Sequence, residues 1–178
     1  MKKLCKEYAK ALYELASEHS LEDTISTQLR QVCTLLDDNP DYVRLLDNPA
    51  IEKKQRIKLA SEAFADVQEY LKSFILLLTE ARHTNELARC ADCFQRIYDT
   101  KHGILRAEII TACGIDDTRA ESIRTKLEAK TGKQVVLSQK IDPSLIGGVL
   151  LKYGTRQIDM SVKASLNSIS EMIMNADI

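Results

Sequence analysis

The feature that most constrains the fold is the stretch from Ile141 to Ser170, where two turns enclose a short apolar run and an amphipathic helix follows. Asp142-Pro143-Ser144 is typical of a turn, because proline presets φ and the flanking side chains can bond to nearby backbone groups. Gly147-Gly148 then allows a positive φ or a close backbone approach. The apolar run after the glycines is too short for a helix, and Tyr153-Gly154-Thr155-Arg156 is a second turn. We therefore predict a buried strand with a hairpin end.

The end of the chain predicts a helix with one apolar face. Ser161 is suited to cap this helix, because its hydroxyl can accept a hydrogen bond from a backbone N–H of the first turn. The apolar residues that follow recur at i, i+4, i+7 and i+11, which is one side of a helix. They are Val162, Leu166, Ile169 and Ile173.

Composition excludes several classes of protein. The chain has 178 residues, 44% of them hydrophobic, and a net charge of -1 with acids and bases mixed, so it carries no electrostatic footprint for nucleic acid. The longest apolar run, Phe74 to Leu78, is far below the roughly 20 residues that a membrane span needs. Charged residues interrupt the first 16 residues, which argues against a signal peptide. Five cysteines, an odd number, suggest reduced thiols in a cytosolic compartment.

From Leu4 to about His102, every periodic segment is helical. Asn39-Pro40 should end the second helix, Asn48-Pro49 should be the cap and first position of the fourth, and Gly103 should end the sixth. Short polar connections place neighbouring helices side by side, so we expect an antiparallel six-helix bundle. The predicted segments are Leu4–Leu15, Ile25–Leu36, Tyr42–Leu46, Ile51–Phe64, Val67–Leu78 and Leu87–Tyr98.

After Gly103 the pattern changes to that of a small α+β unit. Alternation from Leu105 to Thr111 predicts a strand. A helix should open at Asp117-Thr118 and end at Gly132. Two more strands are expected, at Val135–Leu137 and Gly148–Tyr153. The chain should therefore form two domains, a six-helix bundle over residues 1–104 and an α+β domain over 105–178, with a short hinge around residues 102–104.

The ordered signature in the second domain resembles that of the delta subunit of F-type ATP synthases, called the oligomycin-sensitivity-conferring protein in mitochondria. The run Tyr8–Ala16 is also similar to the usual first helix of that family. The resemblance covers nearly the whole chain, and the order of the matching residues is far more specific than a glycine pair alone. These residues are Ile141-Asp142, Ile146-Gly147-Gly148-Val149, Leu151-Lys152, Gly154 and Ile158-Asp159-Met160-Ser161-Val162.

The resemblance implies a non-catalytic stator subunit without a cofactor, which holds the catalytic head of ATP synthase to its peripheral stalk. In the family, the helical domain receives the amino-terminal segments of the alpha subunits in a groove between the first and fifth helices. By position, the groove would be lined by Tyr8, Ala11 and Leu12 on one wall and by Phe74, Leu77 and Leu78 on the other.

The same resemblance implies that the second domain attaches to the b subunits of the stalk. The residues expected to shape that end are Gly147, Gly148, Ser161 and Val162. It further implies one copy per complex, a monomer in isolation, and a peripheral position on the cytoplasmic face of the membrane in a bacterial rather than an organellar enzyme. The sequence departs from many relatives at Glu80-Ala81-Arg82-His83, where they have a Glu-Asn-x-Arg-like turn, so the geometry of this loop is open.

The alternative from another class is a small cytosolic redox or metal-binding protein that uses Cys90 and Cys93. A redox CxxC normally lies at a helix amino terminus beside a strand, whereas this pair lies within a helical run. A zinc site would need two further ligands, and Cys113, His83 and His102 form no second closely spaced pair. Ordinary helix cysteines are therefore the simpler interpretation. No phosphate-binding loop is present in the sequence.

Overall fold

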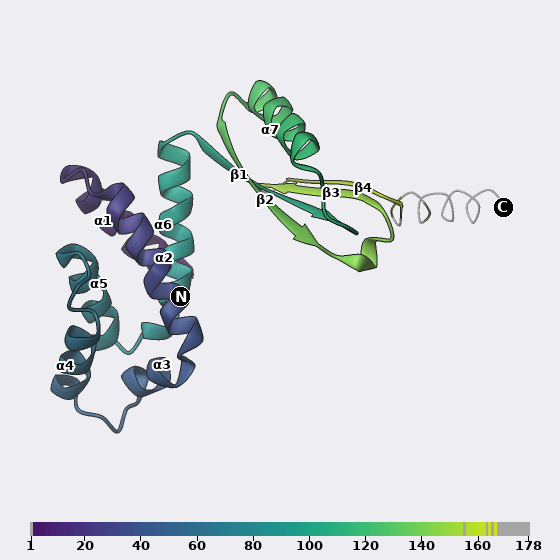
Figure 1. Ribbon diagram of the computed structural model, residues 1–178. Coiled ribbons are helices and arrows are strands. Elements are labelled where there is room, and N and C mark those ends of the chain that lie inside the picture. The colour runs from purple at the N-terminus through teal and green to yellow at the C-terminus, as the bar shows by residue number, and fades with distance from the viewer. Residues whose placement is uncertain (1, 155, 163, 165, 167–178) are drawn as a thin grey trace, which may run out of the picture. The chain divides into compact units, whose positions relative to one another are not determined.

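The computed structural model describes residues 2–154, 156–162, 164 and 166 (Figure 1). It divides into two compact units, Met1–Tyr98 and Asp99–Ile178. This division falls in the last turns of the sixth helix, whereas the sequence placed the domain boundary after that helix. Within the described residues, no helix is both long enough and apolar enough to cross a membrane.

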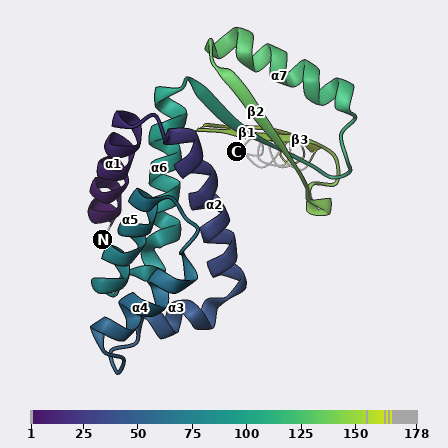
Figure 2. The same cartoon turned by 60° about the vertical axis from the view of Figure 1, so that its left-hand side comes forward.

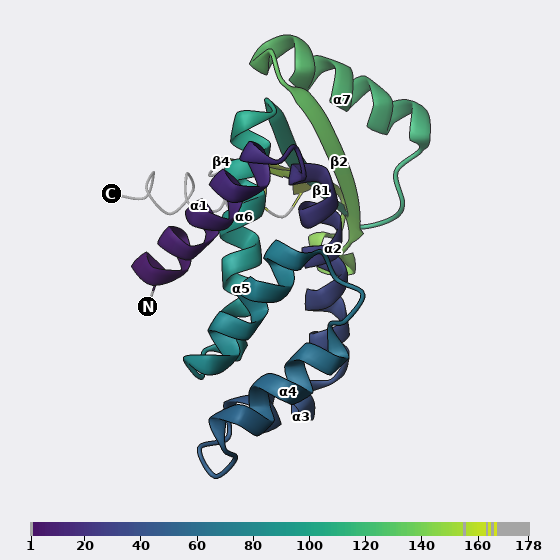
Figure 3. The same cartoon turned by 90° about the vertical axis from the view of Figure 1, so that its left-hand side faces the viewer.

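The first unit is built from six helices, as predicted, and α6 runs on past its end. α5 lies beside both α1 and α4 (Figures 2 and 3). A short 3-10 turn, η1 (Thr84–Glu86), leads directly into α6. The helices are α1 (Lys2–Glu18), α2 (Glu22–Asp38), α3 (Pro40–Asp47), α4 (Lys53–Ala63), α5 (Glu69–Glu80) and α6 (Leu87–Lys101).

Two helices of this unit end on a non-glycine residue in the left-handed conformation. Ser20 after α1 has φ 54° and Arg82 after α5 has φ 57°. At α5, the N–H of His83 donates to the carbonyl of Leu78 over 2.9 Å and that of Arg82 donates to Thr79 over 3.2 Å, the two bonds of a Schellman motif. The loop at Glu80–His83 is thus a tight helix end in which an arginine occupies the position that glycine favours.

The predicted start of the fourth helix was wrong. α4 begins at Lys53, and Pro49 lies in the turn before it. The Asn48 side chain accepts a hydrogen bond from the N–H of Ala50 over 2.9 Å, and the Asn48 carbonyl accepts from Ile51. These bonds close a turn in place of the first helical turn. Pro40, which we expected only to stop α2, occupies the first position of α3.

One apolar core holds the first unit together. The stripe that the sequence predicted for α5 supplies Leu71, Ile75 and Leu78, all almost completely buried, and α6 supplies Leu87 and Phe94. The run from Phe74 to Leu78 is not buried on every side, because Leu77 is 47% exposed. Core packing therefore accounts for most of the apolar residues of this unit, and Leu77 needs another explanation.

The described part of the second unit contains a four-stranded mixed sheet and a helix of 15 residues, which confirms the predicted α+β class. The strand order is β2-β1-β3-β4, with β1 parallel to β2 and the other pairs antiparallel. α7 lies along one face (Figures 1 and 2) and ends at Gly132, with φ 66°. The elements are β1 (Ile104–Thr111), α7 (Asp117–Thr131), β2 (Gln134–Ile141), β3 (Gly148–Tyr153) and β4 (Arg156–Ser161).

β4 was not predicted as a strand. From the sequence, Arg156 was assigned to the second turn and Ser161 to the cap of the final helix, and the residues between them were given no secondary structure. β4 is an edge strand in which only Ser161 is buried, so it lacks the apolar run that marked β3. The hydrogen-bonded pairing with β3, and not an apolar pattern of its own, makes this segment a strand. β2 is also longer than the predicted Val135–Leu137.

The core of the second unit is small. Ala107, Ile109, Leu127, Val135 and Leu151 form it, between α7 and the facing side of the sheet. Met160 is paired with Val149, and Ile158 with Leu151, so both β4 side chains lie on that same face. Both are exposed, Met160 by 61%. α7 therefore leaves the β4 side of this face open.

Candidate functional site

The helices that the sequence predicted to form a groove are neighbours. The rings of Tyr8 and Phe74 meet edge to face, with centroids 6.4 Å apart. The ring of His19, just after α1, stacks on Tyr70 at the start of α5, and the Tyr70 hydroxyl and His19 Nε2 are 2.8 Å apart. Because these contacts occur in opposite order along the two helices, α1 and α5 are antiparallel.

The six predicted wall residues fall into two groups. Leu12, Leu78 and Phe74 are buried and belong to the core of the first unit. Ala11 and Leu77 are exposed, and Tyr8 is half-buried. Only these last three offer surface to a partner. The family resemblance placed all six at the groove by position, but position alone could not separate the residues that face the groove from those in the core beneath it.

Two further residues extend the exposed apolar surface. Leu4 and Leu15 are each 42% exposed. Together with Tyr8 and Ala11 they recur at i, i+4, i+7 and i+11, so they form one stripe along the side of α1 that contacts α5. From the sequence, Leu4 and Leu15 were predicted only as the ends of a helical segment. The sequence did contain a signal for this surface. Apolar residues cover more of the circumference of α1 than a single core-facing stripe requires. We call the set Leu4, Tyr8, Ala11, Leu15 and Leu77 the α1–α5 surface.

The four candidate residues of the second unit come together where β3 starts and β4 ends. Gly148 has φ +83°, and a Cβ there would lie 2.3 Å from the Met160 carbonyl oxygen. The N–H of Val162 donates to the Gly147 carbonyl over 3.0 Å. Ser161 is buried, and its Oγ accepts from the N–H of Ala164 over 3.1 Å, as predicted for a cap. Val162 is exposed; Ile169 and Ile173, predicted on the same helix face, lie outside the described residues.

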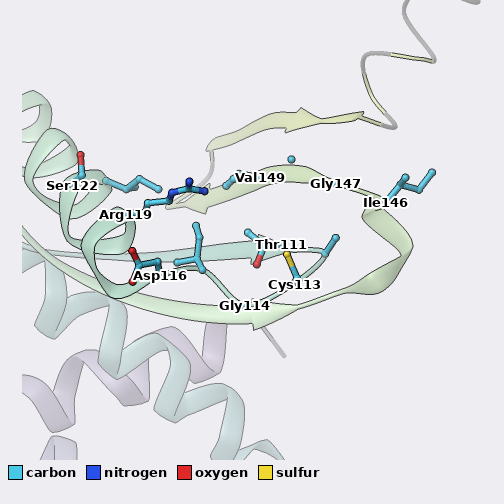
Figure 4. A pocket seen from close by; sticks show the side chains of 13 residues that line it. Thr111, Cys113, Gly114, Asp116, Arg119, Ser122, Ile146, Gly147 and Val149 are labelled. Atoms are coloured by element: carbon cyan, nitrogen blue, oxygen red, sulfur yellow. The ribbon is translucent and has the colours of Figure 1, made fainter.

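A pocket of about 740 Å³ adjoins these glycines. It lies beyond the end of β1, beside the first turns of α7, and is shown in Figure 4. No sequence motif marks Thr111 and Arg119, two polar residues that line it, because they are distant along the chain. We call it the β1–α7 pocket; Thr111, Arg119, Ile123, Ile146, Gly147 and Val149 are among its lining residues.

The cysteine pair does not favour the redox alternative. Cys90 is the fourth residue of α6, nearer the helix start than the sequence suggested, but it is buried. Burial, and then hydrogen bonding with Cys5, raise the pKa of the Cys90 thiol. Burial together with Asp37 and Asp92 raises the pKa of Cys33 to about 11. A redox-active thiol needs the opposite shift. In the part of the chain that is described, no three His, Cys, Asp or Glu residues are grouped to hold a metal ion.

Comparison with known proteins gives one consistent result. The family model of the ATP synthase delta (OSCP) subunit matches residues 4–173. The ATP synthase subunit delta of Trichlorobacter lovleyi is 34% identical over 172 residues, covering 96% of each chain. That of Lactiplantibacillus plantarum is 30% identical over 169 residues, covering 94% of this chain and 93% of the other.

A solved structure shares the fold over the same extent. A chain of the Toxoplasma gondii mitochondrial ATP synthase hexamer superposes with a TM-score of 0.77, at 19% identity, covering 96% of this chain and 97% of that chain. The full-length match to the family model and the identity to bacterial relatives agree with the signature around Gly147-Gly148. The chain belongs to the ATP synthase delta (OSCP) subunit family, the non-catalytic stator subunits of the F-type proton-translocating enzyme.

Proposed function

We propose that the α1–α5 surface binds the amino-terminal segments of the alpha subunits, and that the second unit attaches to the b subunits of the peripheral stalk. The observation that carries the first part is the exposure of three leucines, Leu4, Leu15 and Leu77, along two adjacent helices. Scattered exposed leucines need no explanation, but a continuous stripe beside an aromatic contact is typical of a binding surface.

The chemistry of this surface fits an amphipathic helix. Such a helix places apolar side chains at i, i+3, i+4 and i+7 into a groove between two others. Complete burial of a leucine side chain contributes about 1.5–3 kcal/mol, and each of the three leucines has nearly half of its surface left to bury. Ala11, between Tyr8 and Leu15, lets a partner backbone approach closely.

The proposed mechanism is mechanical. Rotation of the central rotor exerts torque on the catalytic head, and a stator resists it by binding the head at one end and the stalk at the other. The chain then contributes binding free energy and stiffness instead of chemistry. We propose that it is a monomer in isolation without ATPase activity, present in one copy per complex, and located at the cytoplasmic face of the bacterial membrane.

The test is Ala11→Asp. If a partner helix packs on Ala11, the carboxylate must be desolvated or must hold the partner away, and an unpaired buried charge costs several kcal/mol. The Kd for a peptide of the cognate alpha-subunit amino terminus, measured by fluorescence anisotropy with the full chain, should rise roughly a hundredfold or more. Because Ala11 is exposed, circular dichroism should show unchanged helicity.

The matched control is Leu35→Asp, an exposed leucine of α2 that is not part of the α1–α5 surface. It should leave the peptide affinity within about twofold, which corresponds to the effect of an ordinary surface substitution. Unchanged affinity and helicity in Ala11→Asp would remove this surface from the binding site. Loss of helicity would show that Ala11 serves the fold of the first unit.

A further inference from the structure

The β1–α7 pocket has a strained isoleucine at its rim. Ile146 has φ 64° and ψ -42°, and the N–H of Gly147 donates to the Leu145 carbonyl over 2.6 Å across it. This is a γ-turn with positive φ, a rare conformation that is unfavourable for a β-branched residue. The side chain is 71% exposed, so packing does not compensate for the strain. An apolar side chain held in solvent beside a pocket indicates a contact with another molecule.

The pocket also contains a hydroxyl that has no hydrogen-bond partner among the described residues. Thr111 is only 6% exposed and follows Ala107 and Ile109 on the face of β1 that α7 covers. Within the described part of the chain its hydroxyl has no hydrogen-bond partner, although its carbonyl accepts from the N–H of Asp142. Its neighbour in register, Val149, lines the pocket beside it. The hydroxyl oxygen is not completely buried, so it is accessible from the pocket and available to a ligand.

One side of the pocket carries a positive charge. Arg119 extends from α7 toward Val149 (Figure 4), and among the described residues it forms no ion pair. The Asp116 carboxylate also lines the pocket and keeps its negative charge, although it accepts a hydrogen bond from the Thr118 hydroxyl. A guanidinium beside apolar walls at Ile123 and Val149 suits a carboxylate that is flanked by apolar groups, because Arg can pair with it through two hydrogen bonds.

We propose that the β1–α7 pocket binds a segment of a peripheral-stalk b subunit that presents apolar side chains beside a carboxylate. Arg119 pairs with the carboxylate, Ile146 packs on the apolar side chains, and the Thr111 hydroxyl adds a hydrogen bond. This rests on the proposed function, in which the second unit attaches to the b subunits, and it adds which pocket is used and which chemistry is recognised. The pocket adjoins Gly147 and Gly148, so the strained turn and the glycine pair serve one site.

The experiment measures the affinity of the full chain for the part of the cognate b subunit outside the membrane, by isothermal titration calorimetry. Arg119→Gln should raise Kd about tenfold, because a hydrogen-bonded charge loses its partner, and Arg119→Glu should raise it further. Lys126→Glu is the matched control on the same helix, since Lys126 is exposed and does not line the pocket. It should leave Kd within about twofold.

Ile146→Gly separates binding from folding. It removes the apolar contact, so Kd should rise about tenfold. It also relieves the strained γ-turn, so the thermal midpoint should stay the same or rise. A purely structural isoleucine would give a lower midpoint and unchanged affinity. Replacing the acidic residues of the b segment by Asn or Gln, with its terminus amidated, should abolish the effect of Arg119→Gln, which a structural role of Arg119 would not produce.

The outcomes separate the two proposals. If the wild-type chain binds b and neither Arg119→Glu nor Ile146→Gly changes Kd by more than about twofold, the pocket is not the site, and the attachment to b stands without it. If the wild-type chain does not bind b, the attachment itself is refuted and the pocket inference with it.

Discussion

The two units expose apolar surface for different reasons. In the helical unit the exposed leucines lie over a large core, so Leu4, Leu15 and Leu77 are additions to a surface that is already stable. In the sheet unit the core is small, and Ile158 and Met160 are exposed because α7 does not cover their side of the sheet. A partner of the first unit would bind on a core that is already complete. A partner of the second unit would cover the part of the sheet face that α7 leaves exposed. We therefore expect the first unit to withstand isolation better than the second.

The largest expected effect tests this difference directly. A fragment of residues 1–104 keeps the whole of α6 and the complete helical core, and it should unfold cooperatively in urea. A fragment of residues 105–178 should be less stable by several kcal/mol, because a unit of this size buries a smaller share of its surface. A second fragment with an unfolding free energy equal to the first would contradict the comparison.

The next effect concerns the weakest point of the sheet unit. Gly148→Ala places a Cβ 2.3 Å from the Met160 carbonyl oxygen at a backbone φ of +83°, so β3 and β4 must separate locally. We expect a loss of about 2–4 kcal/mol in the unfolding free energy, measured by urea denaturation. Gly114→Ala is the control, because a Cβ there meets nothing within 4 Å and the φ is not positive. It should change stability by less than about 0.5 kcal/mol.

A smaller effect compares how the helices of the two units end. α5 ends on Arg82 in the left-handed conformation, whereas α7 ends on Gly132. Arg82→Gly should stabilise the chain by about 0.5–1 kcal/mol, because the left-handed penalty of an L-residue exceeds the entropy that glycine adds to the unfolded state. Gly132→Ala should destabilise it by about 1 kcal/mol. Thermal melts of both variants check the opposite signs, and equal signs would refute the argument.

The smallest effect concerns one carboxylate in each unit. Hydrogen bonds from Arg89, and then from Cys5, hold the pKa of Glu86 below its usual value. In the sheet unit, hydrogen bonds from the Ser161 hydroxyl and backbone N–H lower the pKa of Asp159. A depressed folded-state pKa stabilises the fold above the unfolded pKa, near 4, and this contribution is lost as the pH falls through the folded value.

Glu86→Gln and Asp159→Asn should each reduce the stability lost between about pH 6 and pH 3. Urea denaturation at several pH values measures this. Circular dichroism is the signal, because the chain has no Trp for fluorescence. A pH dependence identical to that of the wild type would show that the carboxylate gains nothing from its partners.

The sequence predicted the elements whose signals are local. Six helical stripes, the turn at Asp142–Ser144, the cap at Ser161 and the glycine pair were all readable, because periodicity and turn chemistry depend on residues a few positions apart. The turn was confirmed in detail, since the Asp142 side chain accepts from the N–H of Ser144 over 3.0 Å. The strand β4 was missed because its residues become a strand by pairing with β3.

The sequence by itself determined the family, the helical and α+β halves, and the neighbourhood of each candidate site. Only the tertiary structure decided that Leu12 and Leu78 belong to the core while Ala11 and Leu77 face outward, because both sets share the helical period and differ only in what packs against them. Only the structure brought Thr111, Arg119 and Ile146 to one pocket. Residues far apart along the chain become neighbours through strand register and helix placement. Local sequence patterns contain no information about which distant residues will meet.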